Sequence, residues 1–277
     1  MSIIHSILLG ILQGVTEFLP VSSSGHLAIA EHLLGMEGAA QIPEFFDVLL
    51  HIGTLGAVFV AYWKEIRGMA LELIRGVRDL AKGTTPQRIP PDRRMILLIL
   101  VGTLPLFLVL PFKGLVESLS ENMIFIGCAL LFTGAMLWCC DAVQKGRKKE
   151  KNARLTDALV VGAAQAVATC PGISRSGMTI TAGCLMGFER QFAVRYSFLM
   201  SIPAILGAGV LSLKDAVEAG IVWSDVPAYL IGVATAALVG YACIRLLRYI
   251  AGSGHFGVFA YYCWAVGVLV LVFTLVG

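Results

Sequence analysis

Two polar stretches in an otherwise apolar chain repeat each other at a fixed distance. The first is QGVTEFLPVSSSGH, residues 13–26, and the second is QAVATCPGISRSG, residues 165–177. A shift of 152 positions aligns them, and the matched pairs include Gln13/Gln165, Val15/Val167, Ser22/Ser174, Ser24/Ser176 and Gly25/Gly177. An internal repeat of this kind predicts that the two halves of the chain each bring a polar loop to a common site.

The surroundings of these stretches are those of a membrane protein. Of the 277 residues, 57% are hydrophobic and only 14% are charged, whereas a soluble domain carries about 25% charged residues. The charges are bunched between long apolar runs, which predicts a polytopic helical membrane protein. The net charge of +3 is too small to suggest a nucleic-acid partner. The seven cysteines form no CxxC pair and are expected to be small buried hydrophobic residues.

The apolar segments predict an all-α fold built from two repeats. Six are long enough to cross a bilayer, and they cover residues 45–63, 95–112, 123–140, 194–213, 228–247 and 258–276. The apolar pieces around each polar stretch are shorter than a span, so residues 1–35 and 157–187 are each expected to form a re-entrant helical hairpin. Residues 1–156 and 157–277 are then two repeats of one hairpin and three transmembrane helices.

Charge predicts the orientation of the two repeats. The basic segments 64–94 and 144–154 are expected on the cytoplasmic side by the positive-inside rule, and the acidic loop 214–226 then falls outside. Three spans are an odd number, so the repeats are expected to be inverted. One hairpin would enter from each side, and their polar tips would meet near the midplane.

The basic segments themselves allow other interpretations. Residues 63–82 alternate charged and apolar residues at helical spacing, which fits a helix at the membrane interface and also a solvated connecting helix; we favour the latter. The run QKGRKKEKNAR, residues 144–154, could bind anionic lipid or nucleic acid, and we interpret it as a cytoplasmic loop.

The first polar stretch contains a carboxylate where charge is costly. Gln13 and Glu17 are four residues apart and share one helix face. A glutamate at membrane depth must be paired, protonated or metal-bound. Glu17 could be an ordinary helix-end residue at the interface. We favour a carboxylate that binds a divalent cation or accepts a proton, because it lies beside the serine turn.

The second feature is a pair of turns made of serine and glycine. Ser22, Ser23, Ser24 and Gly25 open a helix, and free N–H groups at a helix N-terminus bind anions, although an ordinary serine cap is the simpler explanation. Arg175 occupies the position of Ser23 in the second stretch. Its guanidinium fits phosphate oxygens, so we favour phosphate binding over a structural salt bridge.

Three further residues are candidates near these turns. His26 could serve as an acid, a base or a nucleophile. Thr179 could add a hydroxyl to the phosphate or bond back to its own helix. His51 lies in an apolar span with no evident partner, and helix packing is expected for it. An acid, a hydroxyl, an imidazole and a guanidinium inside a membrane suit phosphoryl transfer.

At these motifs the sequence resembles the undecaprenyl-diphosphate phosphatase family, the bacitracin-resistance phosphatases of bacteria. QGVTEFLPVSSSGH is similar to the family's (E/Q)xxxE segment running into a serine–glycine–histidine loop, and PGISRSGMT is similar to its PGxSRSxxT motif. The hairpins, the six spans and the length also agree, so the resemblance covers the whole chain.

The resemblance implies a homodimeric enzyme of the bacterial inner membrane. Such an enzyme removes the terminal phosphate of the polyprenyl lipid undecaprenyl diphosphate. The monophosphate carrier is thereby recycled for cell-wall synthesis, and the activity confers bacitracin resistance. A divalent cation, Mg²⁺ or Ca²⁺, and a site that opens to the outer side are also implied.

Carried over to this sequence, the resemblance implies roles for individual residues. Glu17 and Gln13 form the metal-binding motif, Ser23 or His26 is the nucleophile, and Arg175 holds phosphate. The other expected phosphate-binding residues are Ser22, Ser24, Gly25, Ser174, Ser176, Gly177 and Thr179. Many members have a glutamate at the position of Gln13. A neutral amide is a weaker metal ligand, so the main role is expected to fall on Glu17.

Two questions stay open at the level of sequence. We favour attack of Ser23 on the terminal phosphorus, with Glu17 or His26 handling the proton, but the sequence does not exclude attack by His26 or by water. A transporter or flippase of an anionic polyprenyl phosphate lipid is the alternative function, because inverted repeats with broken helices are typical of transporters.

Overall fold

The computed structural model describes residues 1–277 except 34–41, 85–88, 219–221, 254 and 277. The described residues form helices and no β-strand, with one isolated bridge between Lys148 and Phe188. Five helical segments among them are long and apolar enough to cross a membrane, or six if one bent pair counts as a single span. The expectation of an all-α multi-pass membrane protein is therefore confirmed, whereas the division into two inverted repeats stays a prediction.

Each polar stretch lies at the turn between two short helices. The first hairpin consists of α1 (Ile3–Phe18) and α2 (Ser23–Leu33), and the second of α8 (Leu155–Val167) and α9 (Arg175–Leu185). At 1.5 Å per residue, α1 is about 24 Å long and α8 about 20 Å. Both are shorter than the hydrocarbon core of a bilayer, about 30 Å. Re-entry of the two hairpins into the membrane stays a prediction.

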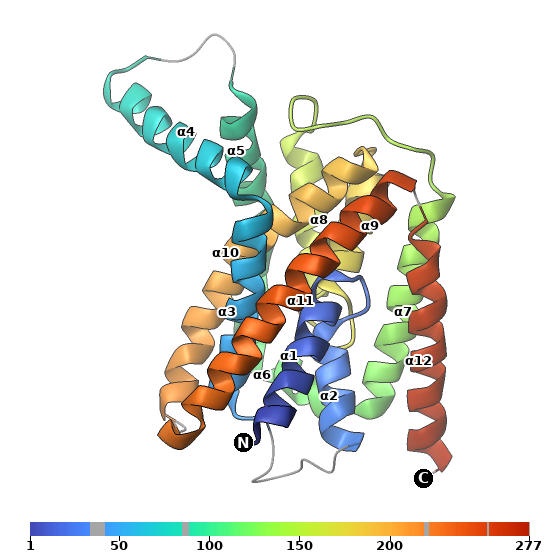
Figure 1. Cartoon of the computed structure of the whole chain (residues 1–277). Coiled ribbons are helices and arrows are strands. Elements are labelled where there is room, and N and C mark those ends of the chain that lie inside the picture. Colours follow the sequence, from blue (N-terminus) through green and yellow to red (C-terminus); the bar gives the residue numbers. More distant parts are fainter. Residues whose placement is uncertain (34–41, 85–88, 219–221, 254, 277) are drawn as a thin grey trace.

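Longer helices surround the hairpins (Figure 1). They are α3 (Glu44–Ala61), α4 (Trp63–Ala81), α5 (Pro91–Thr103), α7 (Met123–Ala142), α10 (Arg190–Glu218), α11 (Val226–Ser253) and α12 (Gly257–Val276). Between α5 and α7 the chain forms short pieces, namely η2 (Leu104–Leu108), η3 (Leu110–Phe112), α6 (Lys113–Ser118) and η4 (Leu119–Glu121). The 3-10 helix η5 (Trp223–Asp225) precedes α11.

The first predicted span ends in a sharp bend. Helix α3 stops at Ala61, and α4 leaves it at an angle of 84°. Helix α4 exposes its apolar side chains, Leu73, Ile74, Val77 and Leu80, while Glu72 is buried and bonds to Arg75 and Arg93. Arg75 and Arg78 are exposed beside these apolar side chains, and a helix that presents apolar and basic residues together suits the membrane interface. This arrangement favours the membrane interface over the solvated connecting helix preferred from the sequence.

The hairpins are held by tight packing against full-length helices. Helix α1 lies against α11, and α8 lies against α5. At the second contact two glycines face each other, and a Cβ atom added to Gly162 would lie 2.2 Å from the carbonyl oxygen of Gly102. Small residues let membrane helices approach this closely. The largest buried cluster, which includes Phe18, Phe192, Tyr196 and Phe198, packs beside the second hairpin.

We expect Gly162→Ala to destabilise the protein, because the added methyl group must push α8 away from α5. Overpacking of this kind costs about 1–3 kcal/mol. Thermal unfolding in detergent measures the effect as a lowered Tm. Gly56→Ala in α3 is the matched control, because no described atom outside its own stretch of helix lies within 4 Å of its added Cβ. Equal Tm values for the two variants would contradict the tight α5–α8 contact.

Candidate active site

The tips of the two hairpins touch each other. In Figure 1 the first hairpin begins near the lower end of the molecule and the second in its upper half. Between their tips, Ser176 Oγ donates a hydrogen bond to the Leu19 carbonyl over 3.4 Å. A Cβ atom on Gly25 would lie 2.9 Å from Gly172 Cα. The structure thus brings together the two stretches that the repeat predicts to share a site.

Each tip is anchored to a neighbouring long helix. In the first hairpin the ring of Phe18 is fully buried and packs edge-on against Phe198 of α10, with 5.4 Å between ring centroids. In the second, the backbone N–H of Ser174 donates to Thr133 Oγ1 of α7 over 3.1 Å, and this hydroxyl donates to the Gly172 carbonyl over 3.3 Å. These contacts fix the backbone on either side of the polar residues.

Glu17 forms the centre of the polar cluster. Its carboxylate is buried and accepts hydrogen bonds from Arg175 Nη2, from Ser23 Oγ over 2.8 Å and from Gln13 Nε2 over 3.2 Å. Glu17 and Arg175 form an ion pair that joins the two hairpins. The pairing explains how both charges are tolerated at this depth. Glu17 is therefore not an isolated helix-end residue.

Arg175 keeps part of its guanidinium available. Although Nη2 bonds to Glu17, the other terminal nitrogen, Nη1, is buried and has no hydrogen-bond partner in the part of the chain that the structure describes. A buried unpaired donor is costly. The salt bridge considered from the sequence is thus present, and one donor of the same side chain remains for an anion.

The two serine turns have the same local hydrogen bonds. Ser22 Oγ accepts from the N–H of Gly25 over 3.3 Å, and Ser174 Oγ accepts from the N–H of Gly177 over 3.1 Å. Ser22 and Ser174 therefore cap α2 and α9, as the simpler interpretation expects. Ser22 has a φ of 75°, a left-handed conformation that is unusual for a residue other than glycine. Such strained residues gather at functional sites.

His26 and Thr179 lie beside the cluster around Glu17 and form hydrogen bonds of their own. The Nδ1 atom of His26 lies 2.7 Å from the Ser22 carbonyl oxygen, and Nε2 lies 2.9 Å from the Tyr262 hydroxyl. Thr179 Oγ1 donates back to the Arg175 carbonyl over 2.8 Å and lies 2.6 Å from Ser197 Oγ. Thr179 therefore bonds back to its own helix, the second of the two roles considered from the sequence. Both ring nitrogens of His26 already have hydrogen-bond partners.

A cavity of about 520 Å³ opens at the cluster. Six predicted site residues line it, namely Glu17, Ser22, Ser23, Ser24, Ser174 and Arg175. The remaining predicted residues, Gln13, Gly25, His26, Ser176, Gly177 and Thr179, are not among its lining. The rest of the wall is largely apolar and comes from the segment after α5 and from the second half of α10, including Phe107, Leu110 and Ile205.

The sequence interpretation missed His51, Asp47 and Gln165, which also line this cavity. His51 was expected to pack between helices, yet its Nε2 lies 3.8 Å from Glu17 Oε2. Asp47, one helical turn earlier, contacts its ring with 3.7 Å between Oδ1 and Nδ1. A polar pair four residues apart in an apolar span was the available signal. Gln165, the repeat counterpart of Gln13, is buried with neither amide atom hydrogen-bonded to a described residue.

The oxygen donors of the cluster suit a hard cation. Gln13 Oε1 is buried beside Glu17 and has no partner among the described residues. In the same part of the chain no group of three or more His, Cys, Asp or Glu residues could hold a metal. Mg²⁺ is often held by one or two carboxylates together with substrate phosphates. Glu17 fits this incomplete kind of site rather than an all-protein cage, whereas Gln13 turns its amide nitrogen toward Glu17 and does not line the cavity.

Comparison with known proteins decides the family. The sequence model of the bacitracin resistance protein BacA matches residues 6–269. The chain belongs to the BacA family. The match includes both polar stretches and all the helices that surround the cavity, so the BacA assignment agrees with the resemblance seen in the motifs.

Curated relatives of this BacA protein are similar over their full length. The undecaprenyl-diphosphatase of Alkaliphilus metalliredigens is 41% identical, with 99% of this chain and 100% of the relative covered. That of Methanosphaera stadtmanae is 37% identical, with 100% and 99% covered. That of Desulforapulum autotrophicum is 40% identical, with 98% of each chain covered.

We expect the Glu17–Arg175 pair to behave as one unit in a double-mutant cycle. Glu17→Gln and Arg175→Gln each leave a buried charge without its partner, at a cost of about 3–5 kcal/mol. The double variant should lose much less than the two losses combined. Unfolding in detergent measures all three.

The control for this cycle is Arg75→Gln. The Arg75 side chain is 67% exposed in its ion pair with Glu72. This pair should therefore contribute less than about 1 kcal/mol to the free energy of unfolding. Additive losses for Glu17 and Arg175 would show that their pairing does not stabilise the contact between the hairpins.

Proposed function

We propose that this protein is an integral-membrane phosphatase that hydrolyses undecaprenyl diphosphate to undecaprenyl phosphate and inorganic phosphate. The observation that carries the proposal is the meeting of Ser23, Glu17 and Arg175 from two hairpins at the wall of a largely apolar cavity. The names of the BacA relatives support the same reaction. The enzyme would recycle the carrier lipid for cell-wall synthesis and confer bacitracin resistance.

The geometry favours Ser23 as the nucleophile. Its hydroxyl already donates to Glu17 Oε2 over 2.8 Å, so the carboxylate can accept the proton as Ser23 Oγ bonds to the terminal phosphorus. The bond from phosphorus to the bridging oxygen then breaks, and undecaprenyl phosphate leaves. Water hydrolyses the phosphoserine and releases phosphate. His26 is a weaker candidate because both of its nitrogens are engaged elsewhere.

Arg175 and the helix ends would hold the phosphate oxygens. Nη1 of Arg175 lacks a partner within the described chain and can donate to an equatorial oxygen as charge develops. The N-termini of α2 and α9 begin at the same tips and add favourable dipoles. The apolar wall with Phe107, Leu110 and Ile205 would take the polyprenyl chain.

A divalent cation, Mg²⁺ or Ca²⁺, is part of this proposal. Glu17 and Gln13 would hold it together with the substrate phosphates, and its charge would offset that of the diphosphate. Gln13 already donates to Glu17 through its amide nitrogen, which directs the amide oxygen away from that carboxylate. Gln13 would thus be the weaker ligand of the two.

We further propose a homodimer in the bacterial inner membrane with its site opening to the outer side. The cavity is lined by Lys113, Val116 and Glu117 of α6, and the charge pattern predicts that the loop containing α6 lies outside. The basic segments 64–94 and 144–154 would be cytoplasmic.

A transporter or flippase of a polyprenyl phosphate lipid is the alternative. The two hairpins with meeting tips are compatible with it. Transport would leave the diphosphate intact and would require a sealed membrane, whereas hydrolysis proceeds in detergent.

We expect purified protein in detergent to release phosphate from undecaprenyl diphosphate. Glu17→Ala, Ser23→Ala and Arg175→Ala should each lower kcat at least about a hundredfold, because each removes a group that acts in the transition state. Ser120→Ala, outside the cavity on η4, is the control and should leave the rate unchanged. Lipid that binds to folded protein but stays intact would make the transporter the leading function.

The metal makes a separate prediction. EDTA should abolish phosphate release, and added Mg²⁺ or Ca²⁺ should restore it. Gln13→Glu supplies a second carboxylate, so it should lower the cation concentration needed for half-maximal activity by about tenfold. Asn122→Asp is a control that adds the same charge at the exposed start of α7. An unchanged cation requirement in Gln13→Glu would remove Gln13 from the metal site.

A further inference from the structure

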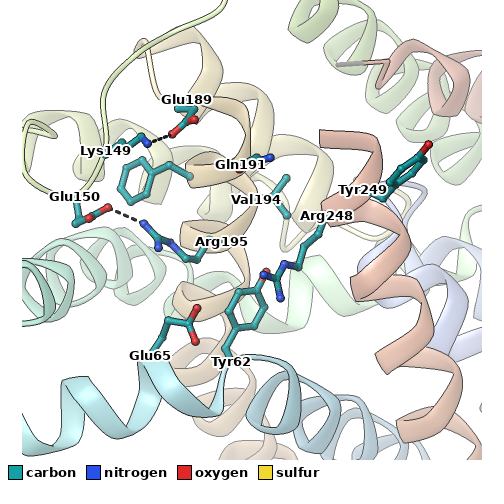
Figure 2. Close-up of a pocket in the computed structure, with 11 residues that line it drawn as sticks. Tyr62, Glu65, Lys149, Glu150, Glu189, Gln191, Val194, Arg195, Arg248 and Tyr249 are labelled. Carbon is teal, nitrogen blue, oxygen red and sulfur yellow. Dashed lines mark hydrogen bonds and ion pairs between the residues drawn. The ribbon is translucent and has the colours of Figure 1, made fainter. Parts of the chain in front are cut away.

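A second cavity lies near the start of α10, away from the candidate active site. Its volume is about 480 Å³, and it is bounded by the α3–α4 junction, the 144–154 loop, the start of α10 and the end of α11 (Figure 2). The active-site cavity uses residues 203–212 of α10, whereas this one uses residues 191–195. The two cavities share no lining residue.

A buried hydroxyl without a partner faces this second cavity. Tyr62, at the bend between α3 and α4, is only 1% exposed, and its hydroxyl makes no hydrogen bond to any described residue. The guanidinium of Arg248 lies over its ring, 5.3 Å from the centroid. A buried hydroxyl normally finds a partner. Its absence within the described chain, next to a cation, indicates a ligand that accepts hydrogen bonds.

Among the charged residues that line the cavity, four form ion pairs and two, one cation and one anion, do not pair with another described residue. Lys149 pairs with Glu189 over 3.1 Å, and Arg195 Nη2 pairs with Glu150 over 2.6 Å. These pairs are drawn in Figure 2, where Arg195 and Arg248 lie on either side of the space above Tyr62.

Two charged residues of the lining therefore remain, Arg248 and Glu65. Neither forms an ion pair with another described residue, although both act electrostatically on the Tyr62 hydroxyl. An anion alone would satisfy Arg248 but would be repelled by Glu65. A ligand that carries a phosphate and an ammonium group satisfies both.

The position of the cavity suits the headgroup of a lipid. Tyr249 lines it and Trp63 directly follows Tyr62 in the chain, and the two are 79% and 58% exposed. Aromatic residues of this kind gather where membrane meets water. The exposed apolar face of α4 begins at the same junction. A lipid whose tails lie against this surface would bring its headgroup to Tyr62.

We propose that this cavity binds the headgroup of an aminophospholipid of the phosphatidylethanolamine type. Arg248 and the Tyr62 hydroxyl donate hydrogen bonds to the phosphate, and Glu65 accepts from the primary ammonium group. The geometry discriminates against two common headgroups. Phosphatidylglycerol offers Glu65 no cation, and the quaternary ammonium of phosphatidylcholine has no N–H to donate.

Native mass spectrometry of the purified protein tests this proposal by titration with each of the three lipids. We expect phosphatidylethanolamine to bind about tenfold more tightly than the other two, the effect of one charge-assisted hydrogen bond. Arg248→Gln should weaken its binding about tenfold, and Tyr62→Phe should weaken it several-fold. Glu65→Gln should bind phosphatidylethanolamine and phosphatidylcholine equally.

Arg245→Gln is the matched control. Arg245 lies one turn earlier on α11, outside the cavity lining, so this variant should bind as the unsubstituted protein does. An unchanged Tm without added lipid shows that each variant is folded. Equal affinities for the three lipids, or an Arg248→Gln variant no weaker than Arg245→Gln, would overturn the proposal.

Soluble phosphoethanolamine distinguishes the source of the headgroup. If it displaces the lipid at concentrations comparable to the lipid's own, the cavity takes a free aminophosphate. If only the lipid binds, the cavity is a lipid headgroup site. Both results support recognition of the aminophosphate.

Discussion

The ion pair between Glu17 and Arg175 is the interaction on which the site depends. Either charge without the other would be buried in an apolar protein at a high cost in free energy. Each belongs to a hairpin whose helices are too short to cross the membrane. Their pairing lets both hairpins end in polar residues and brings Ser23 to the same carboxylate. In the proposed mechanism, stability and chemistry use the same atoms. A substrate phosphate that bonds to Arg175 would free part of Glu17 to act on the Ser23 hydroxyl.

Packing around Glu17 and Arg175 fixes the positions of the two hairpin tips. Phe18 and Phe198 hold the first tip, and Thr133 holds the second. Close contacts with neighbouring helices hold the rest of each hairpin. None of these groups takes part in chemistry. A rigid surrounding is needed because reacting atoms must be placed to within a fraction of an ångström.

Much of this arrangement was predictable because polar residues are so costly in a membrane. The repeat marked both tips, and the cost of burying Glu17 and Arg175 implied partners for them. The positions of His51 and Gln165 at the cavity could not be predicted, because they depend on which helix faces which, and a sequence pattern does not specify this. The face of α4 that packs on the protein could not be predicted either. Its alternation of charged and apolar residues is the same whichever face of the helix packs on the protein. Only the contact of Glu72 with Arg93 shows which face does so.

The half-length helices α1 and α8 have a consequence for the lipid environment. They begin near different ends of the molecule, and their hairpins touch at the tips. The inverted repeat predicts that the outer ends of these two helices lie at opposite faces of the membrane. A bilayer thicker or thinner than the distance between these ends strains the protein by hydrophobic mismatch. In most membrane enzymes that strain can be relieved by tilting whole helices. With the hairpins entering from opposite faces, as the inverted repeat predicts, the strain would act along the line that joins the two tips. The thickness of the membrane would then bear directly on the alignment of Glu17 with Arg175.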